Sequence, residues 1–567
     1  MKKTGTEFKK PYGREIFGKE QVVHYPYPRE RIIPEPIFPY LVFDGGASNF
    51  ANDRFGTVNS DELLRLTMSG ELFSEFSSGG EFNWERSFAY TDKTDFTKKY
   101  EWQIWPQRLY MTIPVAHAFL RTGDKKYSDE WLRIIRGWDA AHPYQPFDPA
   151  IPYLQTDMTW RDMQVAWRTM SMLHGVFMLQ DAPYTREDWE YIYRFIHLHT
   201  DHLYEEALDR LSKNHAQNHV LQIGVVLIMA GVMFPEFDNS EELIRIGIDT
   251  VKMNMEGSIF EDGGSNEDSP SYSHFIVRLY LETLLLLERN GRQAYPGLRE
   301  SIVKQYEWIF HMSSPTGRTL PLSDSYSMDT LADLRRAEAL IPLSFSRERG
   351  SRLFPNSKTG VMKVGNMTLY LDAMSFIPHG HQHAGRPEIL LFRGDEAVLV
   401  EGGICSYDRW ELYMRVRESR MHNVVFCPDL DSEELEIDSD ITLFDPHSGR
   451  VDFVSRVRMG EVSYKWERSL TLEENRLTIV DKAKSDTPIR WQSNLHLKRN
   501  DTKVKNRNTV CQLTDNYLMT LECDREIETD LVPVMNDKNK IDYAVLARVT
   551  GSGDGYGATT VITFEDR

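Results

Sequence analysis

Three groups of side chains in this chain could do acid–base chemistry. The first is Ser212-Lys-Asn-His-Ala-Gln-Asn-His-Val220, which leads into the longest apolar run, Val220–Phe234. Asn214 and Asn218 are four residues apart, as are His215 and His219, so on a helix each pair would share a face. An N-cap with solvent-facing neighbours is the structural alternative. Two Asn-His pairs are more than a cap requires, and periodicity cannot choose between them.

The second segment is a Gly-rich acidic loop, Glu261-Asp-Gly-Gly-Ser-Asn-Glu-Asp-Ser-Pro-Ser-Tyr-Ser-His274. It runs into a predicted helix at about Tyr272. A capped helix start with a surface tyrosine is the alternative interpretation. The ligand spacing of an EF-hand is absent, so the loop does not predict a calcium site.

The third group joins Gly380-His-Gln-His-Ala-Gly385, Val398-Leu-Val-Glu-Gly-Gly403 and Arg417-Glu-Ser-Arg-Met-His-Asn423. The flanking glycines could splay the two histidines, so that His381 faces a cleft and His383 meets a buried metal. Glu401 and His422 would complete a His-carboxylate-His set, a common metal arrangement. We therefore expect one divalent ion, zinc or manganese. No separate general base stands beside the set, so we expect a structural ion rather than a hydrolytic one.

The elements that must position these groups change character along the chain. Residues 1–80 are rich in Pro, Tyr and Phe and predict an irregular arm packed on the body. Helical periodicity marks residues 81–350, with helices expected at 160–180, 187–211, 215–234, 240–255, 272–290 and 297–312. Residues 351–567 turn to a period of two, with hairpins at 390–400, 463–481 and 543–564. We expect a multidomain α+β protein, with an N-terminal (α/α) toroid followed by a C-terminal antiparallel β-sandwich.

The composition of the chain limits the classes of partner and the cellular location that we expect. The net charge of −19 argues against nucleic acid, and an anionic ligand would need a locally basic cleft. The longest apolar run is shorter than the ~20 residues of a membrane span. The four cysteines lack metal-ligand or disulfide spacing and are expected to be buried thiols. The first residues carry charge without an apolar segment, which predicts a cytoplasmic protein, or a secreted or periplasmic one whose leader has been removed.

Together the three groups resemble the heparinase II/III superfamily of polysaccharide lyases, over roughly residues 100–480. The resemblance rests on Asn218-His219 leading into Ala230-Gly231, on Glu267-x-Ser-x-x-Tyr272, on Gly380-His-x-His383 and on His422-Asn423. It implies a helical toroid before an antiparallel β domain, and lyases with broad glycosaminoglycan activity are the most similar. Two departures stand out. Gly385 replaces a usual Asp, and Glu401 replaces a usual Asp.

The resemblance implies β-elimination on a glycan that contains uronic acid, such as hyaluronan, chondroitin, heparan sulfate or alginate. Removing the C5 proton builds an enolate-like dianion, which preplaced donors must stabilise. Asn218 suits that task, because its distances to Ala230-Gly231 and Tyr272 fit the superfamily better than those of Asn214. Tyr272 can act as base at C5 or as the acid that protonates O4. Two histidines that could serve as base complete the set. The expected catalytic residues are Asn218, His219, Tyr272 and His381. Alternative candidates for the same roles are Asn214, His215 and Tyr407.

Substrate contacts are expected from arginines, whose planar fork matches carboxylate and sulfate oxygens. Trp160 could stack on a sugar ring, with core packing as its alternative. The expected substrate-binding residues are Arg161, Arg168, Trp160, Glu267, Arg417 and Arg420.

Two other classes of function stay open. A glycoside hydrolase on a similar toroid would use paired carboxylates, for which Glu261, Asp262, Glu267 and Asp268 are candidates. A glycan-binding protein without turnover would leave the Asn, His and Tyr groups idle. A lyase product gains an ultraviolet-absorbing double bond, which neither alternative produces.

Overall fold

The computed structural model describes residues 60–71 and 105–567, except 153–157, 236, 377–379, 406–409, 431–434, 499–501 and 538. It also describes the paired strands β1 (Glu7–Lys9) with β2 (Val22–His24) and β3 (Ser77–Ser78) with β4 (Glu81–Phe82). The expected N-terminal arm, residues 1–80, lies largely outside the described residues. The chain divides into two compact units, Met1–Ile259 with Phe275–Ile302, and Phe260–His274 with Val303–Arg567. The segment Phe260–His274, which carries Tyr272, thus belongs to the second unit, although it lies among helices in the sequence.

Helices dominate residues 105–338. They are α2 (Ser60–Met68), η3 (Trp105–Arg108), α4 (Thr112–Thr122), α5 (Lys125–Ala141), η5 (Met158–Trp160), α6 (Asp162–Met178), α7 (Arg186–Ser212), α8 (Asn218–Met233), α9 (Ser240–Ser258), α10 (Pro270–Arg289), α11 (Leu298–His311) and α12 (Thr330–Glu338). The six helices predicted from periodicity are confirmed as α6 to α11, to within three residues at each end.

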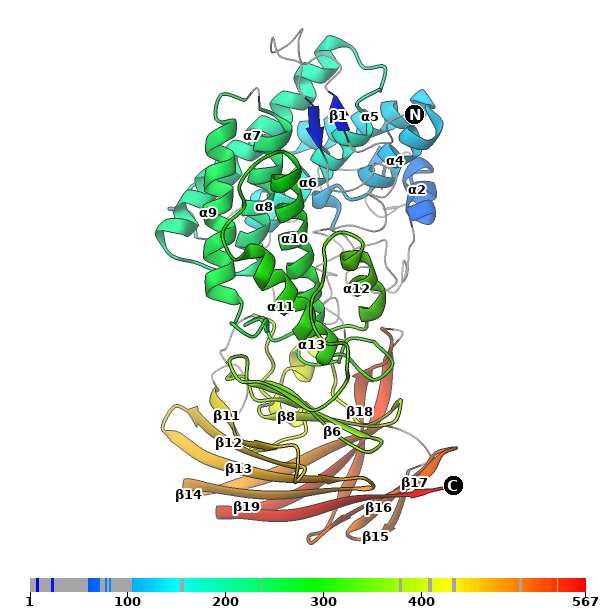
Figure 1. Ribbon diagram of the computed structural model, residues 1–567, viewed down its shortest axis with the longest axis vertical. Helices are drawn as coiled ribbons and strands as arrows, with labels where there is room; N and C mark the ends of the chain where they lie inside the picture. The colour runs from blue at the N-terminus through cyan, green and yellow to red at the C-terminus, as the bar shows by residue number, and fades with distance from the viewer. Residues whose placement is uncertain are drawn as a thin grey trace. The chain divides into compact units, whose positions relative to one another are not determined.

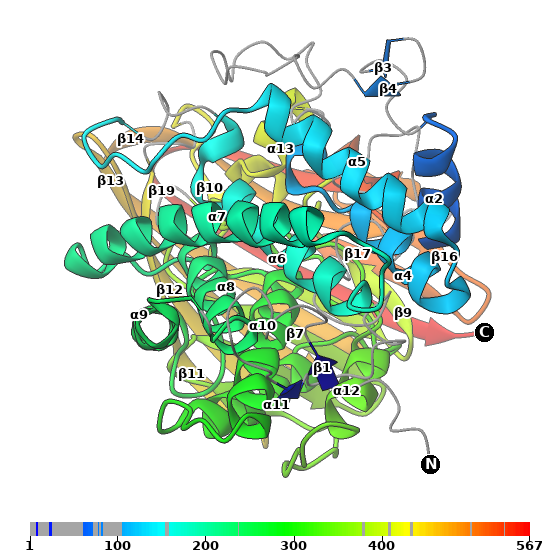
Figure 2. The same ribbon diagram turned by 90° about the horizontal axis from the view of Figure 1, so that it is seen from above.

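Helix α8 is the centre of the first unit, and it packs against α6, α7 and α9 (Figures 1 and 2). All but one of its residues, His219, are buried. Glycines let α9 approach closely, because a Cβ on Gly231 would lie 2.5 Å from the Ser240 carbonyl oxygen. A Cβ on Gly247 would likewise lie 2.7 Å from the carbonyl oxygen of Gly224. The apolar run and its glycines therefore fix the helix that presents Asn218 and His219 at its first turn.

The second unit contains an antiparallel sheet of 15 strands in the part of the chain that is described. Its strands are β5 (Arg352–Phe354), β6 (Thr359–Val364), β7 (Met367–Asp372), β8 (Glu388–Arg393), β9 (Glu396–Leu399), β10 (Val425–Phe426), β11 (Glu436–Asp445), β12 (Arg450–Met459), β13 (Val462–Glu473), β14 (Arg476–Lys498), β15 (Lys503–Asn506), β16 (Thr509–Leu513), β17 (Tyr517–Cys523), β18 (Glu528–Met535) and β19 (Ile541–Asp566), with α13 (Trp410–Val416) and η6 (Ser419–Met421) between β9 and β10. One hydrophobic core joins side chains of β6–β9 with those of β11–β14, β16, β17 and β19. Such a core forms between two facing layers of sheet, so the expected fold class is confirmed.

A single long strand, β19, replaces one of the three predicted hairpins. The hairpins β8–β9 and β13–β14 are as expected. The third, at 543–564, is wrong, because β19 runs unbroken through the Gly-rich segment 551–557 and pairs with β14 along it. A register shift between Lys484 and Ile489 of β14 absorbs the irregularity. The glycines of this segment predicted a turn, but their backbone stays hydrogen-bonded to β14.

Two further expectations concern cysteines and membranes. All four cysteines are free thiols, and three of them, Cys405, Cys427 and Cys523, are buried. Among the described residues, no helix has both the length and the apolar character needed to cross a bilayer.

Candidate active site

Tyr272 and His381 form a stacked pair in the second unit. Tyr272 lies in the first turn of α10, and Gly263 (φ 91°) bends the preceding loop so tightly that a Cβ there would meet the Lys304 carbonyl oxygen at 2.2 Å. The two rings lie 3.6 Å apart between centroids, at an interplanar angle of 25°. Both side chains are half-buried. The pair therefore places a phenol and an imidazole against each other with part of each open to solvent.

Asp324 holds the two histidines of the Gly-His-x-His motif. Its Oδ2 lies 2.9 Å from His381 Nδ1, and its Oδ1 lies 2.9 Å from His383 Nε2. Tyr413 and Arg417 also donate to Oδ2, at 3.0 and 3.2 Å. Asp324 is completely buried, so each of its contacts is shielded from water.

The charge state of Asp324 determines which nitrogen of each histidine carries a proton. Burial opposes ionisation, but the charge of Arg417 and the hydrogen bonds from His381 and His383 outweigh it and hold the pKa of Asp324 well below its usual range. An ionised carboxylate only accepts hydrogen bonds. His381 must then carry its proton on Nδ1, which leaves Nε2 as a lone pair in the neutral ring. His381 is thus prepared to act as a base.

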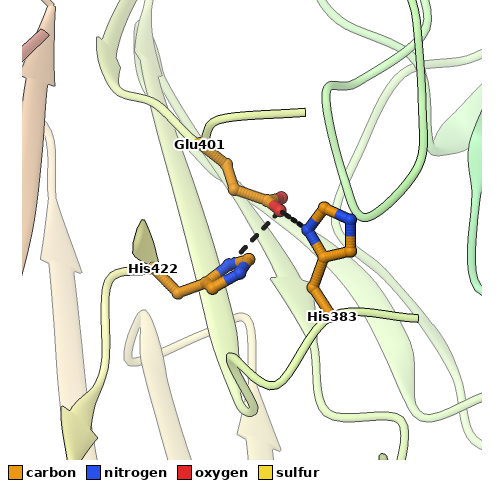
Figure 3. A group of neighbouring side chains, drawn as sticks. All are labelled: His383, Glu401 and His422. Carbon is orange, nitrogen blue, oxygen red and sulfur yellow. Dashed lines mark ion pairs between the residues drawn. The ribbon is translucent and has the colours of Figure 1, made fainter. Parts of the chain in front are cut away.

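His383, Glu401 and His422 converge in a buried group (Figure 3). One ligand atom from each lies within 4.8 Å of the others. The Oε1 atom of Glu401 lies 3.4 Å from His383 Nδ1 and 3.2 Å from His422 Nδ1. All three side chains are completely buried. The set predicted from sequence as a metal site is therefore brought together.

The hydrogen bonds around this group fit a metal ion. His383 donates through Nε2 to Asp324, and His422 donates through Nδ1 to Glu388 at 3.0 Å. The remaining nitrogens, His383 Nδ1 and His422 Nε2, have no hydrogen-bond partner, and neither does Glu401 Oε2. Burial lowers the pKa of His383 to about 3, so its free nitrogen carries a lone pair. These buried atoms have lone pairs without a hydrogen-bond partner, and outer carboxylates orient the two histidines. A divalent ion requires ligand atoms of this kind.

Gly385 departs from the superfamily pattern for a steric reason. A Cβ at this position would lie 2.0 Å from Cγ of His422. Any side chain, including the usual Asp, would displace the His422 ring. The glycine at position 385 therefore leaves room for the ring of His422, one of the three candidate metal ligands (His383, Glu401 and His422, hereafter the metal group).

A second cluster surrounds His219 in the first unit. His219 Nδ1 lies 3.2 Å from Asp162 Oδ2, at the start of α6. Burial raises the pKa of Asp162, but the charge and hydrogen bond of His219 prevail and lower it to about 2. Because Asp162 is ionised, His219 donates to it through Nδ1, and the lone pair of the ring stands on Nε2 whenever the ring is neutral. Glu206 lies behind this pair and accepts from Arg210 at 2.8 Å.

Only one of the two Asn-His pairs lies on the helix. Asn218 is the first residue of α8 and is buried. Asn214 and His215 precede the helix and are exposed, and Asn214 has a left-handed φ of 49°. Helix α8 therefore begins three residues later than expected, and the expectation that the two pairs share helix faces is wrong. The left-handed residue terminates α7, which separates the pairs.

Two expected substrate contacts are part of the core instead. Arg168 is completely buried, donates to His199 Nε2 at 2.8 Å and lies 3.9 Å over the Trp138 ring. Trp160 is 2% exposed and packs beside His199. We assign both to packing.

The other expected contacts vary in exposure. Arg161 is buried at the N-cap of α6. Glu267 is buried, with Oε2 3.8 Å from His381 Nε2. Arg417 binds Asp324, and Arg420 is exposed and pairs with Glu418 at 2.5 Å. Tyr407 lies outside the described residues.

Sequence reasoning missed the carboxylates that orient the histidines. They are Asp324, Glu388 and Asp162, and each meets its histidine across 34 or more residues. Asp324 does carry a weak signal, since it follows Leu320-Pro-Leu322 closely, and a charge that is buried with such residues needs a partner.

Comparison with known proteins agrees with this architecture. The family description "Heparinase II/III N-terminus" matches residues 51–345, and "Heparinase II/III-like, C-terminal" matches residues 346–561. A solved structure titled "Crystal Structure of Heparinase III" superposes with a TM-score of 0.76 at 15% identity, covering 97% of this chain and 88% of that one. A chondroitin AC lyase from Streptomyces coelicolor superposes with a TM-score of 0.58 at 9% identity, covering 91% and 80%.

Curated relatives match a shorter stretch. A heparin-sulfate lyase of Pedobacter heparinus is 24% identical over 252 residues, which is 41% of this chain and 36% of the relative. One from Bacteroides stercoris is 22% identical over 232 residues, 36% and 34% of the two chains. The matches thus span about a third of the length of these relatives. The fold is a helical domain followed by an antiparallel β domain, and the chain belongs to the heparinase II/III family.

Proposed function

We propose that this protein is a polysaccharide lyase that cleaves uronic-acid-containing glycans by β-elimination. The observation that carries the proposal is the Tyr272–His381 stack on the ionised Asp324, which presents a phenol and a basic imidazole together. The family membership and the names of the relatives, heparin-sulfate lyases, support the same class.

The proposed reaction moves one proton from carbon and returns one to oxygen. A base removes the C5 proton of the uronate, the electron pair forms the C4–C5 double bond, and the C4–O4 bond breaks. An acid then protonates the departing O4. We assign these transfers to Tyr272 and to one histidine, His381 or His219, because both imidazoles have Nδ1 on an ionised carboxylate.

The intermediate places a second negative charge on the uronate carboxyl group. We assign its stabilisation to the Asn218 amide, which stands at the start of α8. The preceding backbone is fixed, because Asn254 donates to the Gln217 carbonyl oxygen at 2.8 Å and accepts from Tyr280 at 2.6 Å. A donor held in place before the reaction costs no reorganisation when the charge develops.

We propose one structural divalent ion, zinc or manganese, on His383, Glu401 and His422. When bound, it would supply a positive charge that holds these three side chains together. His383 also binds Asp324, which in turn binds His381. The metal group would thereby position His381 without contacting substrate.

Two of the four carboxylates considered for a hydrolase, Asp262 and Asp268, are committed elsewhere. Asp268 pairs with the buried Arg386. Asp262 accepts from the backbone N–H groups of Asn356 and Ser357 at 2.8 and 2.9 Å. Neither is available as half of an acid pair, which favours the lyase proposal over the hydrolase alternative.

A substrate screen tests the proposal. The protein is incubated with hyaluronan, chondroitin, dermatan, heparan sulfate and alginate, and ultraviolet absorbance is followed. We expect absorbance to rise with at least one glycosaminoglycan, and heparan sulfate is the first choice because the relatives are heparin-sulfate lyases. Binding without any rise in absorbance would contradict the proposal.

A further inference from the structure

A small polar pocket lies in the second unit and shares no residue with the groups described above. Its volume is about 220 Å³. Its floor is the face of two paired strands, where Lys363 stands opposite Thr368 and Val361 opposite Tyr370. His311, at the end of α11, forms one wall, and the turn between β8 and β9 brings Asp395 to the rim.

The pocket carries positive charge within an acidic protein. Lys363 is exposed and has no acidic group within ion-pair distance among the residues that the structure describes. Arg349 is held by the carbonyl oxygens of Ser313 and Ser314, at 3.0 and 2.9 Å, so its charge is fixed at the pocket. A fixed guanidinium and an unpaired ammonium together attract an oxyanion.

His311 adds a buried polar atom without a partner. The side chain is 5% exposed, and its Nε2 has no hydrogen-bond partner. Burial and the charges of Arg352, Arg349 and Arg347 lower the pKa of His311 to about 4, so the ring is neutral at pH 7. An unsatisfied buried nitrogen in a native protein calls for an explanation, and a polar ligand beside it provides one.

Asp395 indicates which oxyanion fits. It is the acidic group of the pocket lining and is exposed at the rim. A bare inorganic anion would be repelled by this carboxylate. A ligand that carries hydroxyl groups beside its carboxylate would be held at both ends, because the hydroxyls can donate to Asp395.

We propose that this pocket binds a sugar acid, with its carboxylate on Lys363 and Arg349 and its hydroxyls toward Asp395. The pocket has room for about one sugar ring. The inference does not depend on the lyase reaction, since none of these residues belongs to the proposed catalytic or metal groups.

Binding of sodium glucuronate tests the proposal, measured by saturation-transfer NMR and calorimetry on the whole protein. Glucose and sodium sulfate at equal ionic strength are the comparison ligands. We expect Lys363→Ala to weaken glucuronate binding at least about tenfold, the effect of losing one charge-assisted hydrogen bond. The matched control is Lys503→Ala, another exposed strand lysine, which should bind as the wild type does.

Two more variants separate the sugar acid from a plain anion. Asp395→Asn should weaken glucuronate binding but not sulfate binding. Gly350→Leu should block the pocket without loss of melting temperature, because a Cβ there meets no atom within 4 Å. Glucuronate binding that is absent, or that is equal in Lys363→Ala and Lys503→Ala, would overturn the proposal. Sulfate binding as tight as glucuronate binding, with the same dependence on Lys363, would overturn the assignment to a sugar acid.

Discussion

The phenol ring of Tyr272 lies on the imidazole ring of His381, with centroids 3.6 Å apart and planes 25° apart. Stacked rings so close hold each other's orientation, and Asp324 fixes His381 at the edge of its ring through Nδ1. We assign proton transfer to the hydroxyl of Tyr272 and to Nε2 of His381.

Removal of the Tyr272 hydroxyl should separate catalysis from folding. In Tyr272→Phe the ring stays on His381, so we expect an unchanged melting temperature and a fall in kcat of ~10²–10⁴-fold, the usual effect of losing a general acid or base. The exposed Tyr543 provides the control, since Tyr543→Phe should change neither quantity. Near-full activity in Tyr272→Phe would move the role to another residue, with Tyr407 and Tyr413 the next to test.

The two asparagines before α8 should respond differently. Asn218→Ala should lose roughly 2.7–4 kcal/mol of transition-state stabilisation, as when one oxyanion donor is deleted. Asn214 has a left-handed φ of 49°, so Asn214→Ala should cost about 1–2 kcal/mol of folding stability, with little loss of turnover. Asn214→Gly relieves that strain and should restore the melting temperature. If Asn214→Ala abolishes kcat and Asn218→Ala does not, the assignment of Asn218 is wrong.

The metal group predicts a response to chelation. Purified protein should contain about one divalent ion per chain by elemental analysis, and a strong chelator should lower the melting temperature, because the ion binds only the folded state. In Glu401→Gln the chelator should have no further effect, whereas substitution of the exposed His447 by Gln should leave the response intact. A metal-free preparation with unchanged melting temperature and activity would refute the site.

Glu206 predicts a pH dependence of stability. Burial and the charge of Asp162 raise its pKa from 4.5 to about 7. Between these values the folded protein holds a proton that the unfolded chain has released. The free energy of unfolding should therefore fall as pH rises from 4.5 to 7, by up to about 3 kcal/mol.

The variant Glu206→Gln cannot titrate, so it should lack this contribution and gain stability relative to the wild type at pH 8. Denaturant unfolding between pH 4 and pH 8 measures the difference. Its neighbour Glu205 is exposed, and Glu205→Gln should keep the wild-type slope. Identical slopes in the wild type and Glu206→Gln would contradict the raised pKa.

The regular elements of this fold could be predicted from sequence because their signals are local. Apolar periodicity placed α6 to α11, and the turn residues placed the β8–β9 and β13–β14 hairpins. The local signals failed where tertiary contacts override them. Glycines 551–557 stay in a strand because β14 pairs with them, and residues 214–217 leave the helix because Asn214 turns left-handed.

The site could be predicted by residue type but not by partner. His383, Glu401 and His422 were identified because their chemistry is specific and their spacing resembles the family. Asp324 was missed because its partners lie 57 and 59 residues away, and no periodicity reports such a contact. Arg168 was misassigned because a buried arginine over Trp138 has the same sequence signature as an exposed one.

The fate of water in the reaction tests the central claim most directly. The protein is incubated with the responsive glycosaminoglycan in heavy-oxygen water, and the products are weighed by mass spectrometry. β-Elimination adds no water, so we expect 4,5-unsaturated products, lighter by one water than hydrolysis products and free of heavy oxygen. Saturated products that carry one heavy oxygen atom at each new reducing end would show hydrolysis and contradict the account.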